Sequence, residues 1–309
     1  MLEKLSKKIV NIANDNGTLS TDMSLSNSSQ RYTQWTAELR KNGLLSDEYL
    51  LPKLEVPCTK ILPDLMSSGE PSQETGSLEK QIENLGPWGY GIQLCDNVAT
   101  EKTPVSLARM TYRSHLITGA VREILGDEIS KTTVLDMACN HGYFALDIAY
   151  HGAKNAIGVD LRQENINKAL FLKQHFKISN TDFMQKDIYD LDSEQKFDVV
   201  YNLGLFYHIT DPYTLMQKTY DMCTEFAVVD SIMHKMPASV FVQRLNKDTS
   251  HHAEGEFSVE LHPTYRAMID LMHAVGFKKI IEVVPADDEN RASYKLYDSN
   301  HRRCLIGFK

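Results

Sequence analysis

Four successive predicted strands of this chain end on side chains that can bind a polar ligand: Asp136, Asp160, Asp187 and Asn202. A carboxylate such as Asp160 can accept hydrogen bonds from both hydroxyls of a ribose. One such as Asp187 can accept from the exocyclic amine of an adenine. Taken singly, each residue also fits a helix cap or a surface turn. Because the four follow one another in order, we expect them to form one binding site for a nucleotide-like ligand.

The turn after the first of these strands, "DMACNHG", joins a strand to a helix that starts at Gly142. A helix N-terminus offers free N–H groups to a ligand. Ala138 is small enough to let a ligand approach the backbone, and Asn140 is the non-glycine residue best suited to a positive φ. A dinucleotide dehydrogenase would carry glycine at both positions. The turn therefore favours a nucleotide-like ligand other than the dinucleotide of a dehydrogenase.

Alternating strands and helices must position these residues. The segments "TVLDMA", "NAIGVD" and "FDVVYNLG" each have a strand pattern and are followed by a helical pattern. Such alternation predicts an α/β fold with a mostly parallel sheet and helices on both faces, in which ligands bind beyond the carboxyl ends of the strands. Upstream, "WGYGIQL" alternates in the manner of a further strand.

Composition excludes several classes of function. The 309 residues carry a net charge of −8, and basic residues occur at most in pairs, which argues against a nucleic-acid partner. No apolar run approaches the roughly 18 residues of a membrane span. The five cysteines are widely separated and match no metal-ligand spacing. We expect a cytoplasmic globular protein with free thiols and no bound metal.

Residues Thr132 to Ser231 resemble the class I S-adenosylmethionine-dependent methyltransferases. The resemblance rests on "VLDMACNHGYF", "AIGVD", "QKDI" and "FDVVYNLGLFYHITDP". With the flanking "WGYGIQLCDNVATEKTP", "YRS" and "HPTYRAMIDLMHAVGF", it extends over about Gly86 to Lys309. This longer stretch is similar to a subgroup that includes tRNA wobble-uridine carboxymethyl-transfer enzymes and related small-molecule methyltransferases.

The resemblance implies a Rossmann-like fold with a mostly parallel seven-stranded sheet. It places a cofactor-covering strand and helix at 86–130, and the core at 131–309 with a cap insertion at about 234–262. The polar, loop-rich region before them is expected to form an N-terminal helical and loop extension at 1–85. The extension either covers a domain or builds a homodimer contact. The implied cofactor is S-adenosylmethionine, and the residues implied to bind it are Tyr112, Arg113, Asp136, Ala138, Asn140, Gly142, Asp160, Leu161, Asp187, Ile188, Asn202 and Leu203.

The acceptor pocket is expected over the later strands and under the cap. His208 with Tyr207 is the candidate catalytic pair, although His208 can equally bond the cap and do no chemistry. The candidate substrate-binding residues are Trp88, Tyr90, Arg244, His251 and Glu256. Paired hydrogen bonds from Arg113 and Arg244 would suit a carboxylate. The first hypothesis is therefore methyl transfer to a small polar metabolite that carries a carboxylate. The alternatives are a tRNA wobble-uridine enzyme and a non-catalytic cofactor-binding module.

Overall fold

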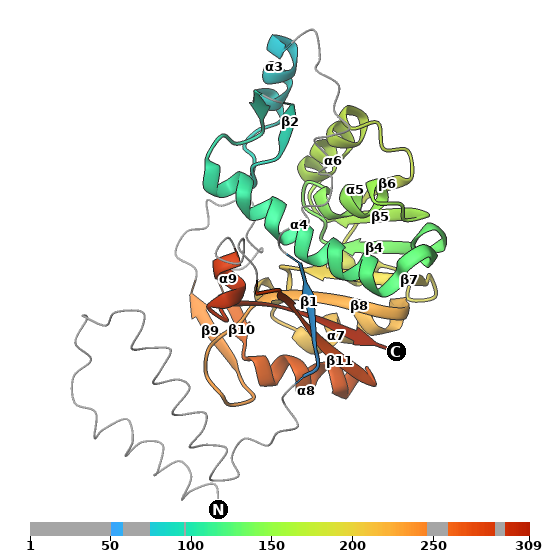
Figure 1. Cartoon of the computed structure of the whole chain (residues 1–309), viewed down its shortest axis with the longest axis vertical. Coiled ribbons are helices and arrows are strands. Elements are labelled where there is room, and N and C mark those ends of the chain that lie inside the picture. Colours follow the sequence, from blue (N-terminus) through green and yellow to red (C-terminus); the bar gives the residue numbers. More distant parts are fainter. Residues whose placement is uncertain (1–50, 58–74, 96, 246–258, 288–293) are drawn as a thin grey trace, which may run out of the picture. The chain divides into compact units, whose positions relative to one another are not determined.

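The computed structural model describes residues 51–57, 75–95, 97–245, 259–287 and 294–309 (Figure 1). The chain divides into two compact units, residues 1–49 and 50–309, and the described residues all belong to the second. The predicted helices before residue 50, together with His251 and Glu256, lie outside the described residues. Cys95, Cys139, Cys223 and Cys304 are free thiols. Within the described ranges, every helix is too short or too polar to cross a bilayer.

An eight-stranded sheet forms the centre of the second unit, in the order β1-β11-β12-β8-β7-β4-β5-β6. The five strands from β6 to β8 are parallel, whereas β12 runs antiparallel to both of its neighbours. The strands span Lys53–Val56 (β1), Thr133–Met137 (β4), Asn155–Asp160 (β5), Thr181–Gln185 (β6), Phe197–Leu203 (β7), Cys223–Ile232 (β8), Lys279–Pro285 (β11) and Arg302–Phe308 (β12). The predicted mostly parallel sheet is confirmed. One strand, β1, extends it from within the segment assigned to the N-terminal extension.

Helices cover both faces of this sheet (Figure 1). Helices α4 (Pro104–Leu125), α5 (Tyr143–Tyr150) and α6 (Gln163–His175) lie on one face, and α7 (Pro212–Met222) and α8 (Tyr265–Val275) pack together on the other. The pleat of β4 explains the two cores, because successive side chains point to opposite faces. Val134 enters the large apolar cluster beside α5, whereas the sulfur of Met137 lies 3.7 Å from the Thr219 hydroxyl of α7.

The segment before α4 differs from its predicted strand. Of the predicted strand "WGYGIQL", only the end forms a strand, β2 (Gln93–Cys95). It follows α3 (Thr75–Leu85) and pairs with the short β3 (Val98–Ala99). Backbone N–H groups in this segment bond to side chains instead of a neighbouring strand. That of Gly91 donates to Ser106 Oγ at 2.8 Å, and that of Ile92 to Thr100 Oγ1 at 2.9 Å. The alternation of large side chains therefore reflects packing onto the core beside α6.

The predicted cap contains an antiparallel hairpin of β9 (Phe241–Leu245) and β10 (Val259–Pro263). Strand β10 packs against the short helix η5 (Phe206–His208), which follows β7. The remaining described elements are η3 (Gly126–Lys131), η4 (Ile188–Asp190) and α9 (Lys295–Asp298). The hairpin thus reaches the segment that carries the predicted catalytic pair.

Candidate functional site

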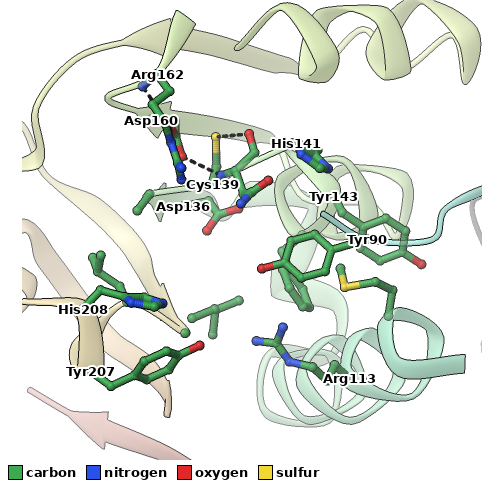
Figure 2. A pocket seen from close by; sticks show the side chains of 17 residues that line it. Tyr90, Arg113, Asp136, Cys139, His141, Tyr143, Asp160, Arg162, Tyr207 and His208 are labelled. Atoms are coloured by element: carbon green, nitrogen blue, oxygen red, sulfur yellow. Dashed lines mark hydrogen bonds and ion pairs between the residues drawn. The ribbon is translucent and has the colours of Figure 1, made fainter. Parts of the chain in front are cut away.

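A cavity opens at the carboxyl ends of β4, β5 and β7, where strand-end ligand sites of α/β sheets occur. It encloses about 770 Å³ of empty space, part of which is open solvent. Figure 2 shows its 17 lining residues. The predicted site residues among them are Tyr90, Arg113, Asp136, Ala138, Asn140, Asp160, Leu203, Tyr207 and His208. The structure therefore brings together residues from several motifs in one place.

The turn after β4 has an unusual backbone. Ala138, Asn140 and Gly142 have φ values of 55°, 52° and 75°, so alternate residues are left-handed. Asn140 was predicted to tolerate this conformation. Ala138 was expected only to provide space, but it also adopts the left-handed conformation, which costs a non-glycine residue roughly 1–2 kcal/mol. The turn is held by the Cys139 N–H, which donates to the Val159 carbonyl at 2.8 Å.

Gly142 is needed at the start of α5 for packing as well as for its backbone angle. It is the N-cap of the helix and does not itself line the cavity. A Cβ at this position would lie 2.5 Å from the Phe183 ring of β6 and 2.8 Å from the Ala169 Cβ of α6. Any side chain would therefore push the helix away from the turn.

Asp160 organises the turn from the end of β5. The residue is 3% exposed. Its Oδ2 accepts from the Asn140 backbone N–H at 2.9 Å, and its Oδ1 accepts from the Arg162 N–H and from Asn165 Nδ2, each at 3.0 Å. A carboxylate offers about four acceptor positions, so one position on Oδ2 stays available to a ligand.

Asp136 presents a buried acceptor without a partner. Its Oδ2 makes no hydrogen bond among the described residues, although the residue is only 2% exposed and lines the cavity. Burial raises the pKa of Asp136 to about 8, against the hydrogen bond from the Ala145 N–H, and the nearby Asp160 adds to the rise. A cationic donor placed in the cavity would both satisfy this oxygen and favour the ionised carboxylate.

His141, in the same turn, is held neutral. Its ring packs edge-on to Trp88 and Tyr90, with centroid separations of 5.1 and 5.7 Å. Burial lowers the pKa of His141 to about 3, and the positive charge of Lys168 acts in the same direction. The segment before α4 therefore closes over the turn through these two aromatic rings. Tyr90 reaches the cavity, whereas Trp88 lies behind it and donates from Nε1 to the Ile82 carbonyl at 2.8 Å.

Two arginines meet one carboxylate beside the cavity, and Arg113 is the member of this group that lines it. Arg113 Nη2 and Arg302 Nε each donate to Asp230 Oδ1 at 2.7 Å, and the Tyr297 hydroxyl donates to Asp230 Oδ2 at 2.9 Å. Although burial would raise the pKa of Asp230, the two guanidinium groups lower it. Two positive charges against one negative charge leave an excess positive charge. Both guanidinium groups reach Gly204 of the cavity wall, because a Cβ there would lie 2.9 Å from Arg302 Nη2 and 3.7 Å from Arg113 Nη2.

The predicted catalytic pair forms the wall opposite Tyr90 (Figure 2). The rings of Tyr207 and His208 have centroids 4.2 Å apart. Burial lowers the pKa of His208 to about 4, and this exceeds the opposing effect of Glu260 on β10. His208 is therefore neutral near pH 7 and can accept a proton.

Several predicted cofactor residues lie outside the cavity lining. Asn202 is fully buried and donates from Nδ2 to Thr219 of α7 at 3.0 Å. Asp187 caps η4 by accepting from the Tyr189 N–H at 2.9 Å, and Ile188 is buried beside it. Tyr112 packs against Tyr294, at 5.0 Å between ring centroids.

Two further predicted residues are on the surface. Leu161, predicted to lie against an adenine, is 52% exposed. Arg244, predicted to bind the acceptor, is an exposed residue of β9 that does not line the cavity. The assignments of these side chains to a ligand stay predictions.

The sequence motifs left other lining residues without a role: Met110, Cys139, His141, Tyr143, Phe144, Arg162, Gly204 and Leu205. Cys139 and His141 alternate with the left-handed residues of the turn, so the position of these two residues in the turn could have indicated that they line the cavity. Met110 carried no such signal, because it lies on α4, before the core strands begin. In the part of the chain that the structure describes, no group of His, Cys, Asp and Glu side chains could hold a metal ion.

A family model described as a methyltransferase domain matches residues 129–269. A tRNA U34 carboxymethyltransferase of Campylobacter hominis is 33% identical over 175 residues, which are 55% of this chain and 56% of that protein. A ubiquinone biosynthesis O-methyltransferase of Rickettsia conorii is 30% identical over 102 residues, 33% of this chain and 34% of that protein. The chain thus spans about half or less of the length of these curated relatives.

A solved structure has a related fold. It is that of the N-terminal domain of EvdMO1 in the presence of SAH and D-fucose, with a TM-score of 0.53 and 16% identity. The similarity covers 78% of this chain and 98% of that one. At this identity the similarity shows the fold alone.

Proposed function

We propose that this chain, which carries a methyltransferase domain at residues 129–269, transfers a methyl group from S-adenosylmethionine to a small acceptor that bears a carboxylate. The observation that carries the proposal is one cavity that is lined on one side by an unpaired buried carboxylate oxygen of Asp136 and on another by Arg113, which shares the Asp230 carboxylate with Arg302 behind the wall. The first suits the ammonium group of the cofactor, and the second suits a carboxylate.

The residues of the turn after β4 fit this cofactor. Asp136 Oδ2 is a buried acceptor that needs a donor, and an ammonium group is a strong one. The left-handed residues Ala138 and Asn140 bring backbone close to the cavity at the start of α5. Asp160 keeps one acceptor position for a ribose hydroxyl while its other positions hold the turn. We assign these four residues to cofactor binding.

When bound, the cofactor supplies an electrophilic methyl group on a positively charged sulfur. The chain then has to hold the acceptor atom close and aligned, exclude water and take up any proton that the acceptor loses. Tyr90 and Phe144 line the cavity with aromatic rings. His208 is neutral at pH 7 and is the proton acceptor that the cavity offers to a hydroxyl or amine.

The carboxylate of the acceptor is assigned to Arg113 and Arg302. Both guanidinium groups are buried, with side-chain exposures of 6% and 7%, and they share the single Asp230 carboxylate. A second carboxylate would balance their charge, and little side-chain freedom would be lost because the arginines are already held in place. Arg113 was predicted both to bind the cofactor and, together with Arg244, to bind a carboxylate. We propose Arg302 as its partner in the second role, in place of the exposed Arg244.

The test is a screen of small metabolites, in which release of S-adenosylhomocysteine is measured. Each carboxylic acid is compared with its amide, which has the same shape and lacks the charge. The proposal predicts turnover of at least one acid and a loss of about tenfold or more in kcat/KM for its amide, because one hydrogen-bonded charge pair contributes roughly 1.5–3 kcal/mol. Equal turnover of acid and amide would remove the carboxylate from the proposal.

Transfer to tRNA is the second candidate, because several curated relatives are named tRNA U34 carboxymethyltransferases. The net charge of −8 argues against a large nucleic-acid surface. Filter binding of unmodified tRNA at increasing salt separates the two. Tight binding that weakens steeply with salt would favour tRNA as the acceptor. A chain that binds neither tRNA nor the cofactor would be a non-catalytic module.

A further inference from the structure

Two histidines share one carboxylate beside the cavity. His208 belongs to η5 and lines the cavity, whereas Glu260 and His262 belong to β10 of the cap hairpin. Glu260 Oε1 lies 3.6 Å from His208 Nδ1, and Glu260 Oε2 lies 2.7 Å from His262 Nε2. Both residues of β10 lie within the predicted cap insertion.

The strand geometry explains why these groups meet. Glu260 and His262 are two residues apart on β10 and therefore point to the same face, and this strand packs against η5. A carboxylate only accepts hydrogen bonds, so His262 Nε2 must donate to it. The side chains are largely buried, with exposures of 14% for His208, 18% for Glu260 and 5% for His262. His262 thus fixes one oxygen of Glu260 and leaves the other facing His208.

We propose that Glu260 is a positioning residue for His208, and that it holds Nδ1–H of the ring so that Nε2 receives the proton of the acceptor. The inference rests on the proposed function, because it needs an acceptor that loses a proton. A separation of 3.6 Å is longer than a hydrogen bond, as is common for catalytic pairs in the absence of substrate. The pair tightens when the ring becomes positively charged.

The proposed step transfers one methyl group and one proton. The acceptor oxygen or nitrogen forms a bond to the transferred methyl carbon, and the carbon–sulfur bond breaks with its electron pair going to sulfur. The proton of the acceptor moves to Nε2 of His208, which becomes an imidazolium. The Glu260 carboxylate faces Nδ1 of this ring, and no further reactant is required.

Four titratable or charged groups surround His208, two on β10, one on β12 and one at the N-cap of α6. Glu260 raises the pKa of His208, whereas burial, Arg162, His262 and Arg302 lower it, and the result is a pKa of about 4. Among the described residues, Glu260 is therefore the one acidic group that acts on this ring. Loss of its charge should lower the pKa of His208 further and weaken the histidine as a base.

The first experiment measures the ring directly in the full-length chain. Nitrogen-15 histidine spectra, with His208 assigned through the variant His208→Gln, report its tautomer and its pKa. In wild type, we expect the proton on Nδ1. Glu260→Gln keeps an acceptor and should lower the pKa of His208 by about 1 unit, the lower end for a close opposite charge that is partly exposed. Glu260→Met should also move the proton to Nε2.

The matched control is Glu225→Gln, which changes an exposed glutamate at the far end of β8 and should leave the His208 resonances unchanged. If Glu260→Gln and Glu260→Met change neither the tautomer nor the pKa of His208, the proposed pairing is wrong. Because this experiment needs no acceptor, its result is independent of whether the proposed function holds.

The second experiment measures turnover with an acceptor found in the metabolite screen. Glu260→Gln should lower kcat by about tenfold or more and shift the pH profile of kcat, with an unchanged KM for the acceptor. Glu260→Asp should recover part of kcat. A raised KM with unchanged kcat would make Glu260 a binding residue and overturn the proposal. A wild-type chain that releases no S-adenosylhomocysteine with any acceptor would instead contradict the proposed function.

Discussion

Replacement of Asp160 by asparagine separates cofactor binding from support of the turn. The carboxylate accepts three hydrogen bonds, two of them on Oδ1 and one on Oδ2. An amide has the same shape, keeps one oxygen and turns an N–H group toward one set of donors. One buried donor then loses its acceptor, at a cost of about 2 kcal/mol. For a unit of this size we expect a fall in Tm of roughly 5 °C.

The same substitution should weaken the binding of S-adenosylmethionine by about tenfold to a hundredfold, because a hydrogen bond to a charged acceptor contributes roughly 1.5–3 kcal/mol. Calorimetry gives Kd, and thermal unfolding gives Tm. Asp182→Asn is the control, since Asp182 on the neighbouring β6 is 70% exposed and makes only a surface ion pair to Lys173. A lowered Tm with an unchanged Kd would refute ribose binding and leave Asp160 with a structural role.

Three further substitutions test the turn. Asn140→Gly should leave Kd unchanged, because glycine adopts a φ of 52° readily, and a lost affinity would assign the amide to ligand binding. Gly142→Ala should cost about 3 kcal/mol through overlap with Phe183 and the positive φ, measured as a lower Tm than in Gly126→Ala, whose φ is also positive but which faces open space. Asp136→Asn should gain stability relative to wild type between pH 4 and 8. The pKa of Asp136 is raised to about 8, so the wild-type carboxyl favours folding below pH 4 and loses that contribution as pH rises through 8. A Tm difference that is flat with pH would contradict the raised pKa.

The fold was predictable because its signal is local. The strands that carry Asp136, Asp160 and Asn202 at or next to their ends can be recognised directly from apolar runs and the boundaries of those runs. Strand β1 was not found, because four residues, Lys53–Val56, carry too short a pattern for detection. The predicted strand around Trp88 shortened to Gln93–Cys95, since side-chain acceptors took the backbone N–H groups. An alternation of large side chains could not distinguish a paired strand from an extended segment whose backbone N–H groups bond to side chains.

Cavity-lining residues were predictable where a single sequence motif contains both the strand and the residue at its end that faces the cavity. Ala138, Asn140 and Asp160 illustrate this, because the turn and the strand end are contiguous in sequence. Arg302 and Glu260 were not identified, since they reach the cavity region from an antiparallel strand and a cap hairpin that lie far along the chain. Their contribution depends on strand order and register, which no local pattern contains. Asn202 matched its motif, yet its amide turns toward α7.

Titration of S-adenosylmethionine into the full-length wild-type chain is the most direct test of the account. We predict saturable binding at one site per chain, with a Kd in the range of roughly 1 µM to 1 mM that is usual for enzyme substrates. The affinity should fall in Asp160→Asn and stay unchanged in Asp182→Asn. No binding of S-adenosylmethionine or S-adenosylhomocysteine to a folded chain would contradict the assignment of the cavity, and with it the proposed methyl transfer.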